Sequence, residues 1–120
     1  MYQLNDLLYL MQRLRDPQTG CPWDLKQNFA SIVPHTLEEA YEVADAIERN
    51  DFEQLPGELG DLLFQVVYYS QLATEEGRFG FVEVVDSITR KLLRRHPHVF
   101  PAGDLRAVAD AQSLAEAAVK

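Results

Sequence analysis

The segment from Leu59 to Ala73 restricts the possible folds of this chain more than any other part of its sequence. Its apolar residues are spread around almost the whole circumference of a helix, so a helix here is expected to be central and buried. Two carboxylates nevertheless accompany it, Glu58 just before the segment and Asp61 within it. Burying an ionised carboxylate without a partner is costly, so we expect something positive to meet both groups.

Three other segments carry apolar residues on a single helical face and predict helices over 4–15, 36–50 and 81–95. The first should end before Pro17. We expect a loop over 21–36, with one short helical turn around 26–32 that Pro34 closes. The next helix should begin at Thr36, because Thr36 and Glu39 have the spacing of a capping box. Without strand-like alternation, these elements predict an all-α fold, a four-helix bundle.

Composition limits the classes of protein that this chain can represent. Its 120 residues, 47% of them apolar, suffice for the core of a single domain. The net charge of -8 argues against a nucleic-acid partner. The single cysteine, Cys21, permits no internal disulfide and fits a reducing cytoplasm, and no segment resembles a signal peptide or reaches membrane-spanning length. We therefore expect a soluble cytoplasmic protein without a membrane partner.

A row of acidic residues marks the helix predicted from Thr36. Glu38, Glu42 and Asp45 share one helical face, and Glu39 lies just to its side. Taken alone, this row is compatible with an ordinary solvated helix face and does not by itself indicate a metal site. Glu38 and Glu39 would also complement the dipole of a helix that starts at Thr36.

The carboxylates of the following apolar helix favour a metal site. If Glu58 and Asp61 face the acidic row, the cluster offers only oxygen ligands, which suit Mg²⁺ or Mn²⁺. The alternative is that Glu58 complements the dipole of its own helix and Asp61 pairs with an arginine. A di-iron bundle would need Glu-x-x-His pairs, and none of the histidines, His35, His96 and His98, has a glutamate three residues before it.

The acidic residues also carry a resemblance to a known family. Glu38-Glu39-Ala40-Tyr41-Glu42, followed after fifteen residues by Glu58-Leu59-Gly60-Asp61, resembles the E-E-x-x-E…E-x-x-D signature of MazG-type nucleoside triphosphate pyrophosphohydrolases. This family belongs to the all-α NTP pyrophosphatase superfamily. The runs 11–16, 20–24 and 95–100 are also similar to MazG segments, so the likeness covers roughly residues 4–100. It predicts a MazG-like domain over 1–100 and an alanine-rich tail over 101–120, a frayed helix or disordered.

The resemblance implies a reaction. MazG-type enzymes hydrolyse a nucleoside triphosphate, NTP or dNTP, to the monophosphate and pyrophosphate with Mg²⁺. Carried onto this chain, the metal ligands would be Glu39, Glu42, Glu58 and Asp61, with Mn²⁺ a possible substitute for Mg²⁺. Glu38 would act with Glu39 in catalysis, as an additional ligand or as the group that orients water. A catalytically weak module kept for dimerisation or partner binding is the alternative, and a solvated acidic bundle without metal is a third.

Four further residues are candidate substrate contacts. Lys91 and Arg95 lie one helical turn apart, and the resemblance implies that such a pair contacts the triphosphate. At a helix end they would equally complement the dipole. Trp23 could stack on a base and Lys26 could contact a phosphate, although Trp23 is as easily a core anchor under its loop.

The resemblance also concerns assembly. Related domains form dimers or higher assemblies, and a single subunit could hardly cover the apolar circumference of the 59–73 helix, so we expect dimerisation to complete the bundle. Relatives commonly continue into a Trp-Glu-x-x-Lys segment, which the tail from Gly103 lacks. The chain could be a single-domain variant or the first half of something longer, and its base preference is not predicted.

Overall fold

The computed structural model describes residues 1–119 and confirms the all-α class, since these residues form helices and turns without a strand. Contacts divide the chain into two compact units, Met1–Phe81 and the remainder from Val82. The helices of the first unit are α1 (Leu4–Leu14), α2 (Pro22–Leu25), α3 (Phe29–Glu48) and α4 (Leu55–Glu75). The others are α5 (Phe81–Arg95), the short 3₁₀ helix η1 (Pro101–Gly103) and α6 (Ala111–Val119).

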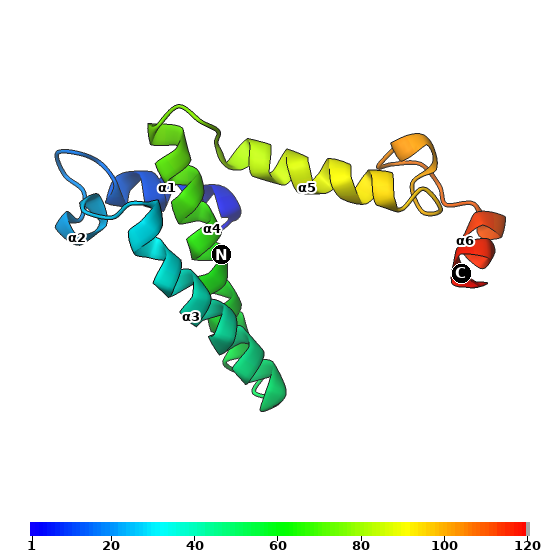
Figure 1. Cartoon of the computed structure of the whole chain (residues 1–120), viewed down its shortest axis with the longest axis horizontal. Helices are drawn as coiled ribbons and strands as arrows, with labels where there is room; N and C mark the ends of the chain where they lie inside the picture. The colour runs from blue at the N-terminus through cyan, green and yellow to red at the C-terminus, as the bar shows by residue number, and fades with distance from the viewer. Residues whose placement is uncertain (120) are drawn as a thin grey trace. The chain divides into compact units, whose positions relative to one another are not determined.

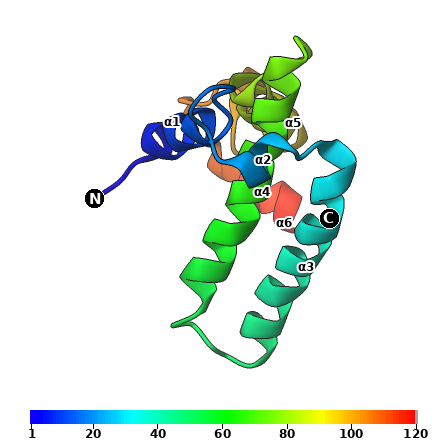
Figure 2. The same cartoon turned by 90° about the vertical axis from the view of Figure 1, so that its left-hand side faces the viewer.

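The first unit is built on an antiparallel hairpin of α3 and α4, which lie side by side in Figures 1 and 2. The other long helix of this unit, α1, packs against α4. Buried side chains from all three helices form one core, made of Met11, Ile32, Val67, Tyr68 and Leu72. The members of this core on α4, Val67, Tyr68 and Leu72, lie in the carboxyl half of that helix.

Helix α3 begins earlier than the sequence pattern predicts. Asn28 is its N-cap, and it exchanges two hydrogen bonds with Ser31: the Ser31 amide donates to Asn28 Oδ1 over 2.9 Å, and the Asn28 amide donates to Ser31 Oγ over 2.8 Å. This reciprocal cap starts the helix before Pro34, which the helix then includes. The predicted start at Thr36 and the predicted stop at Pro34 are therefore wrong. Most of the expected 21–36 loop is helical, because α2 also occupies Pro22–Leu25.

Helix α4 is buried over only part of its length. Its carboxyl half holds buried residues at five of the seven positions from Val67 to Ala73, as predicted for a central helix. Its amino half leaves Leu59, Leu63 and Val66 exposed in this single chain. Within the first unit the expected burial is thus seen in the carboxyl half, and the covering of the amino half by a second copy of the chain stays a prediction.

The second unit contains the rest of α5, η1 and α6. None of the residues of α5 is buried, and one of its faces exposes Val82, Val85, Ile88 and Leu92. A turn follows α5, in which the Phe100 amide donates to the carbonyl of His96 over 2.9 Å. Among residues 1–119, no helix combines the length and the apolarity that crossing a membrane requires.

Candidate metal centre and nucleotide site

Three carboxylates converge where α3 faces the amino half of α4. They are Glu39 from the middle of α3 and Glu58 and Asp61 from α4, and one oxygen of each lies within 4.8 Å of an oxygen of the other two. The antiparallel hairpin causes this convergence, because it sets the middle of one helix against the first turns of the next. The structure thus brings together three of the five acidic residues that the sequence singles out.

Glu39 is the least solvated member of this cluster. It lies on the face of α3 that also carries Ile32, Thr36 and Ala46, and its Oε2 atom is buried without a hydrogen-bond partner among the described residues. Burial raises the pKa of Glu39, and the charges of the neighbouring carboxylates, Asp61 first, raise this pKa further. Because α3 begins at Phe29, Glu39 is too far from the helix start for the dipole to stabilise its charge.

Glu58 is in a similar position at the start of α4. Burial raises its pKa first, and the charges of Glu42 and Asp61 add to this effect. Arg49 acts in the opposite direction, but its guanidinium is bonded to Asp45 and Asp51. Since Glu58 lies in the first turn of α4, the helix dipole still favours its negative charge, and this alternative explanation of its place remains open.

The other two acidic residues lie at the edge of the cluster. Glu38 and Glu42 are exposed and are not among the three that converge, yet the charges of both contribute to the raised pKa of Glu39. Within residues 1–119, no lysine or arginine forms an ion pair with any of the three converging carboxylates. The alternative in which Asp61 pairs with an arginine therefore finds no support among these residues.

The donor set of the cluster fits a hard divalent cation. It offers only carboxylate oxygens, which Mg²⁺ and Mn²⁺ prefer. A cation would satisfy the buried Oε2 atom of Glu39 and would offset the mutual repulsion that raises the pKa values of Glu39 and Glu58. A neutral hydrogen-bond donor would satisfy the Oε2 atom but would not offset the repulsion between the carboxylates.

A hydrogen-bonded polar layer lies next to the carboxylates between the same two helices. The Thr36 hydroxyl lies 2.5 Å from the hydroxyl of Tyr69 and 3.2 Å from Oε1 of Gln65. Gln65 is only 8% exposed, so this layer belongs to the interior of the hairpin. The sequence pattern does not predict this polar layer, because it places Thr36 at a helix cap. The signal was present, since Thr36 precedes Glu39 by three residues and Gln65 follows Asp61 by four, which places each pair on one helical face.

The segment around α2 carries two candidate substrate contacts, the aromatic Trp23 and the basic Lys26. Trp23 is 53% exposed, and its ring meets the ring of His35 edge-on at a centroid distance of 5.9 Å. It is therefore not the core anchor that the sequence left as an alternative. Lys26 is exposed at the end of α2. Between them, Asp24 is buried, and its carboxylate accepts a hydrogen bond from the Tyr68 hydroxyl over 3.0 Å.

The sequence match agrees with this geometry. A family model described as the MazG nucleotide pyrophosphohydrolase domain matches residues 27–100, which include α3, α4, α5 and all five acidic candidates. The chain belongs to this family. The resemblance stated from the sequence is thereby confirmed, and the match begins after the Trp23 segment.

This MazG domain matches parts of longer curated proteins. It is 65% identical over 100 residues to a nucleoside triphosphate pyrophosphohydrolase of Escherichia coli, a stretch that covers 83% of this chain and 38% of that protein. A nucleoside triphosphate pyrophosphohydrolase/pyrophosphatase MazG of Thermotoga maritima is 44% identical over 95 residues, 79% of this chain and 37% of that protein. A nucleoside triphosphate pyrophosphohydrolase of Mycobacterium tuberculosis is 36% identical over 118 residues, 97% of this chain and 35% of that protein. The chain thus spans little more than a third of the length of these relatives.

The basic candidates Lys91 and Arg95 belong to the second unit of the MazG domain. Both lie in the last turns of α5, where Lys91 is half-buried and Arg95 is exposed. The structure does not define the position of this unit relative to the carboxylates. Their contact with a triphosphate therefore stays a prediction.

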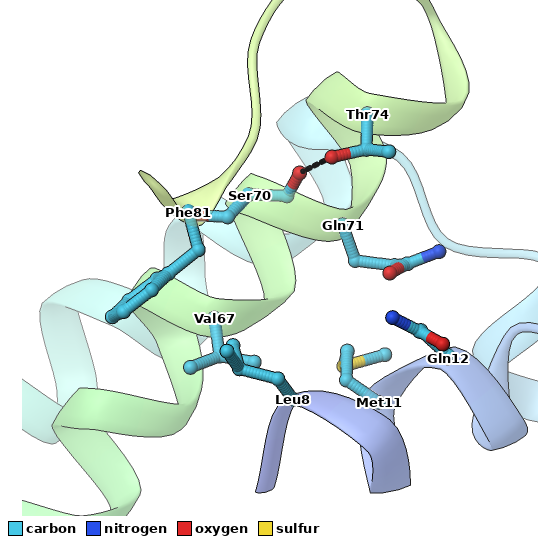
Figure 3. Close-up of a pocket in the computed structure, with 8 residues that line it drawn as sticks. All are labelled: Leu8, Met11, Gln12, Val67, Ser70, Gln71, Thr74 and Phe81. Atoms are coloured by element: carbon cyan, nitrogen blue, oxygen red, sulfur yellow. Dashed lines mark hydrogen bonds between the residues drawn. The ribbon is translucent and has the colours of Figure 1, made fainter. Parts of the chain in front are cut away.

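A small pocket elsewhere in the first unit does not compete with the carboxylate cluster. It lies between α1 and the carboxyl half of α4, and Figure 3 shows the amides of Gln12 and Gln71 pointing toward one another there. Its volume is about 110 Å³, and Met11, Val67 and other neutral side chains line it. Ligand pockets usually have volumes of about 300–1,000 Å³, so this one is too small for a nucleotide.

Proposed function

We propose that this MazG domain hydrolyses nucleoside triphosphates, NTPs or dNTPs, to the monophosphate and pyrophosphate in a Mg²⁺-dependent reaction. The names of the curated relatives support the reaction class, and the family match covers every acidic candidate. The observation that carries the proposal is the buried, unpaired Oε2 atom of Glu39 inside a cluster of three carboxylates. Such a group is costly to a fold unless it binds something positive.

In this proposal, Glu39, Glu42, Glu58 and Asp61 hold the metal, which Mn²⁺ could replace. Bound Mg²⁺ neutralises phosphate charge and lowers the pKa of a coordinated water. Glu38 is exposed beside Glu39 and orients the attacking water, or serves as one more ligand. The oxygen of this water forms a bond to phosphorus as the anhydride P–O bond between the α and β phosphates breaks, so monophosphate and pyrophosphate leave and a proton is released.

The basic and aromatic candidates bind the rest of the substrate. Lys91 and Arg95 contact phosphate oxygens, which arginine can hold through two hydrogen bonds at once. Lys26 adds a phosphate contact, and Trp23 provides an aromatic face for the base. Nothing in these residues fixes the base or the sugar that the domain prefers.

Product release tests the proposed function directly. The full chain is incubated with Mg²⁺ and each of eight NTPs and dNTPs, and monophosphate and pyrophosphate are measured. We expect release that requires the metal and that falls at least 100-fold in Asp61→Asn and Glu42→Gln, as expected for loss of metal-ion catalysis. Glu48→Gln is the matched control, because Glu48 is an exposed carboxylate at the far end of the same helix as Glu42.

The alternative is a catalytically weak module kept for dimerisation or for a partner. It predicts product release from the native chain no faster than from Asp61→Asn. A solvated acidic bundle without metal predicts in addition that Mg²⁺ with a non-hydrolysable nucleotide leaves the melting temperature unchanged.

A homodimer, or a higher assembly, is part of the same proposal. Leu59 and Leu63 on α4 and Leu37 and Tyr41 on α3 are exposed apolar residues of the hairpin that carries the carboxylates. A second copy of the chain would cover them. Light scattering should therefore return at least twice the mass of the chain at micromolar concentration. The single cysteine suits the reducing cytoplasm in which we place this protein.

A further inference from the structure

One guanidinium joins three separate elements of the first unit. Arg15 caps the carboxyl end of α1, and its Nη1 donates to the main-chain carbonyls of Asp24 and Gln27, the latter over 3.2 Å. Its other side donates to both carboxylate oxygens of Glu75 near the end of α4, from Nε to Oε2 over 3.0 Å. The Arg15 side chain is only 10% exposed. Forked contacts of this kind fix a guanidinium in orientation as well as in position.

Tyr68 on α4 provides a second hydrogen-bonded contact to the segment around α2. The Tyr68 hydroxyl, on a residue that is 1% exposed, lies 3.0 Å from Oδ1 of Asp24 and 3.1 Å from its main-chain oxygen. Asp24 is itself 7% exposed. Arg15, at the end of α1, and Tyr68, on α4, thus both donate hydrogen bonds to Asp24 and hold α2 against these two helices.

This arrangement determines where Trp23 is presented. Because Asp24 turns into the interior, the preceding Trp23 turns out, and more than half of its large apolar surface stays exposed. Its ring and the ring of His35 form a T-shaped contact with an angle of 73° between the ring planes, so His35 does not stack on the indole. An exposed aromatic ring whose segment is held by buried hydrogen bonds offers a rigid surface on which a planar group can stack.

The exposed ring lies close to the carboxylate cluster. His35, which it contacts, and Glu39 are four residues apart on α3, which places them on the same face and about 6 Å apart along the helix axis. A nucleotide has its base and its phosphates at opposite ends of a sugar. The spacing suits a ligand whose phosphates bind at the cluster and whose base reaches the indole.

We propose that Arg15 is a positioning residue for nucleotide binding: with Glu75 and Tyr68 it holds α2 so that Trp23 forms the wall against which the nucleobase stacks. The proposal rests on the proposed function for the location of the phosphates. It assigns a use to the 11–16 and 20–24 segments, which the metal chemistry leaves without one. Arg15 touches no substrate atom in this scheme and acts only through the segment it holds.

The chain reports on this wall by itself, since Trp23 is its only tryptophan. The α,β-methylene analogues of ATP, GTP, CTP and UTP, which cannot be cleaved between the α and β phosphates, are titrated with Mg²⁺ into the full chain. Trp23 emission and heat of binding are recorded. We expect at least one analogue to quench the emission with the same dissociation constant that calorimetry gives. Calorimetric binding without a change in emission would overturn the proposal.

Inorganic tripolyphosphate separates positioning from general damage to the fold, because it has phosphates and no base. Arg15→Lys keeps the charge but cannot make the forked contacts. We expect it to weaken analogue binding at least 10-fold and to leave tripolyphosphate binding within twofold of the native chain. Glu75→Gln should show the same pattern more weakly, and it serves if Arg15→Lys fails to fold. Arg13→Gln, an exposed arginine of the same helix, is the control and should change neither constant.

The steady state adds a further test. Trp23→Phe and Arg15→Lys should raise KM at least 10-fold and change kcat less than threefold. Equal losses for tripolyphosphate and analogues, or unchanged analogue affinity in Arg15→Lys and Glu75→Gln, would overturn the positioning role while hydrolysis by the native chain still supports the proposed function. Binding and quenching without hydrolysis would support the wall and reject the proposed function. Failure of the native chain to bind any analogue would overturn the wall.

Discussion

The hydroxyl group of Tyr68 offers a quantitative test of how α2 is held. Tyr68→Phe removes one oxygen and leaves the ring, so the buried core keeps its shape and no larger cavity opens. What is lost is the donor to Asp24, whose buried carboxylate and main-chain oxygen lie 3.0 and 3.1 Å away. A hydrogen bond to a charged acceptor contributes about 1.5–3 kcal/mol, and the acceptor left without it stays desolvated. We therefore expect the free energy of unfolding to fall by about 2 kcal/mol.

Urea unfolding followed by circular dichroism measures this change, and differential scanning calorimetry should show a melting temperature lower by about 8 °C. The slope of the unfolding free energy against urea should not change, since both chains bury the same surface. Tyr9→Phe is the control, because Tyr9 is 58% exposed, and its loss should stay within about 0.5 kcal/mol.

A double-mutant cycle assigns the loss to the Tyr68–Asp24 contact. Asp24→Asn should cost less in the Tyr68→Phe background than in the native chain, with a coupling energy of about 1–2 kcal/mol. Strict additivity of the two changes, or a melting temperature lowered by less than about 2 °C in Tyr68→Phe, would refute the view that this hydrogen bond holds α2.

Three further outcomes follow from the same structure. Glu39→Gln should raise the melting temperature of the metal-free chain, because folding crowds and desolvates this carboxylate, and should reduce the increase that Mg²⁺ produces; calorimetry with and without Mg²⁺ checks both signs. The Arg15 guanidinium lowers the pKa of Glu75 below its ordinary value of 4.5. This pair therefore contributes stability above that pH and loses it as the pH falls through the lowered pKa. The free energy of unfolding, measured in urea, should fall more between pH 5 and pH 3 in the native chain than in Glu75→Gln. Gly20→Ala should destabilise the chain by more than about 2 kcal/mol in urea unfolding, because its Cβ would come within 3.0 Å of main-chain atoms of Leu14 and Asp16, whereas a comparable loss in Gly57→Ala, which has open space, would contradict this steric explanation.

The long helices were predictable because their apolar residues recur with the period of a helix over several turns. The boundary of α3 was not, because two local signals competed. Pro34 and the Thr36–Glu39 spacing indicated a start after the proline, but Asn28 and Ser31 make a complete reciprocal cap earlier in the chain. A proline near the start of a helix removes one hydrogen bond, and the packing of Ile32 in the core offsets that loss.

The sequence predicts that Glu39, Glu58 and Asp61 converge only if the acidic faces of two antiparallel helices turn inward together. Periodicity gives the face of each helix but not its rotation against the neighbour, so the sequence could not decide which carboxylates meet. It also could not find the contacts of Arg15 with Glu75 or of Tyr68 with Asp24, because these join residues 60 and 44 positions apart. The roles of the acidic, basic and aromatic candidates stay predictions.

The hydrogen bonds of Thr36 with Gln65 and Tyr69 also select one alignment of α3 against α4. An interface made only of aliphatic side chains can slide by a helical turn at little cost, whereas a buried polar layer is satisfied in one register alone. Glu39 lies one turn from Thr36 on α3, and Asp61 lies one turn from Gln65 on α4. A shift by one turn would therefore break the layer and separate the carboxylates together, so the spacing of a cation site is set by neutral residues that need never touch the cation.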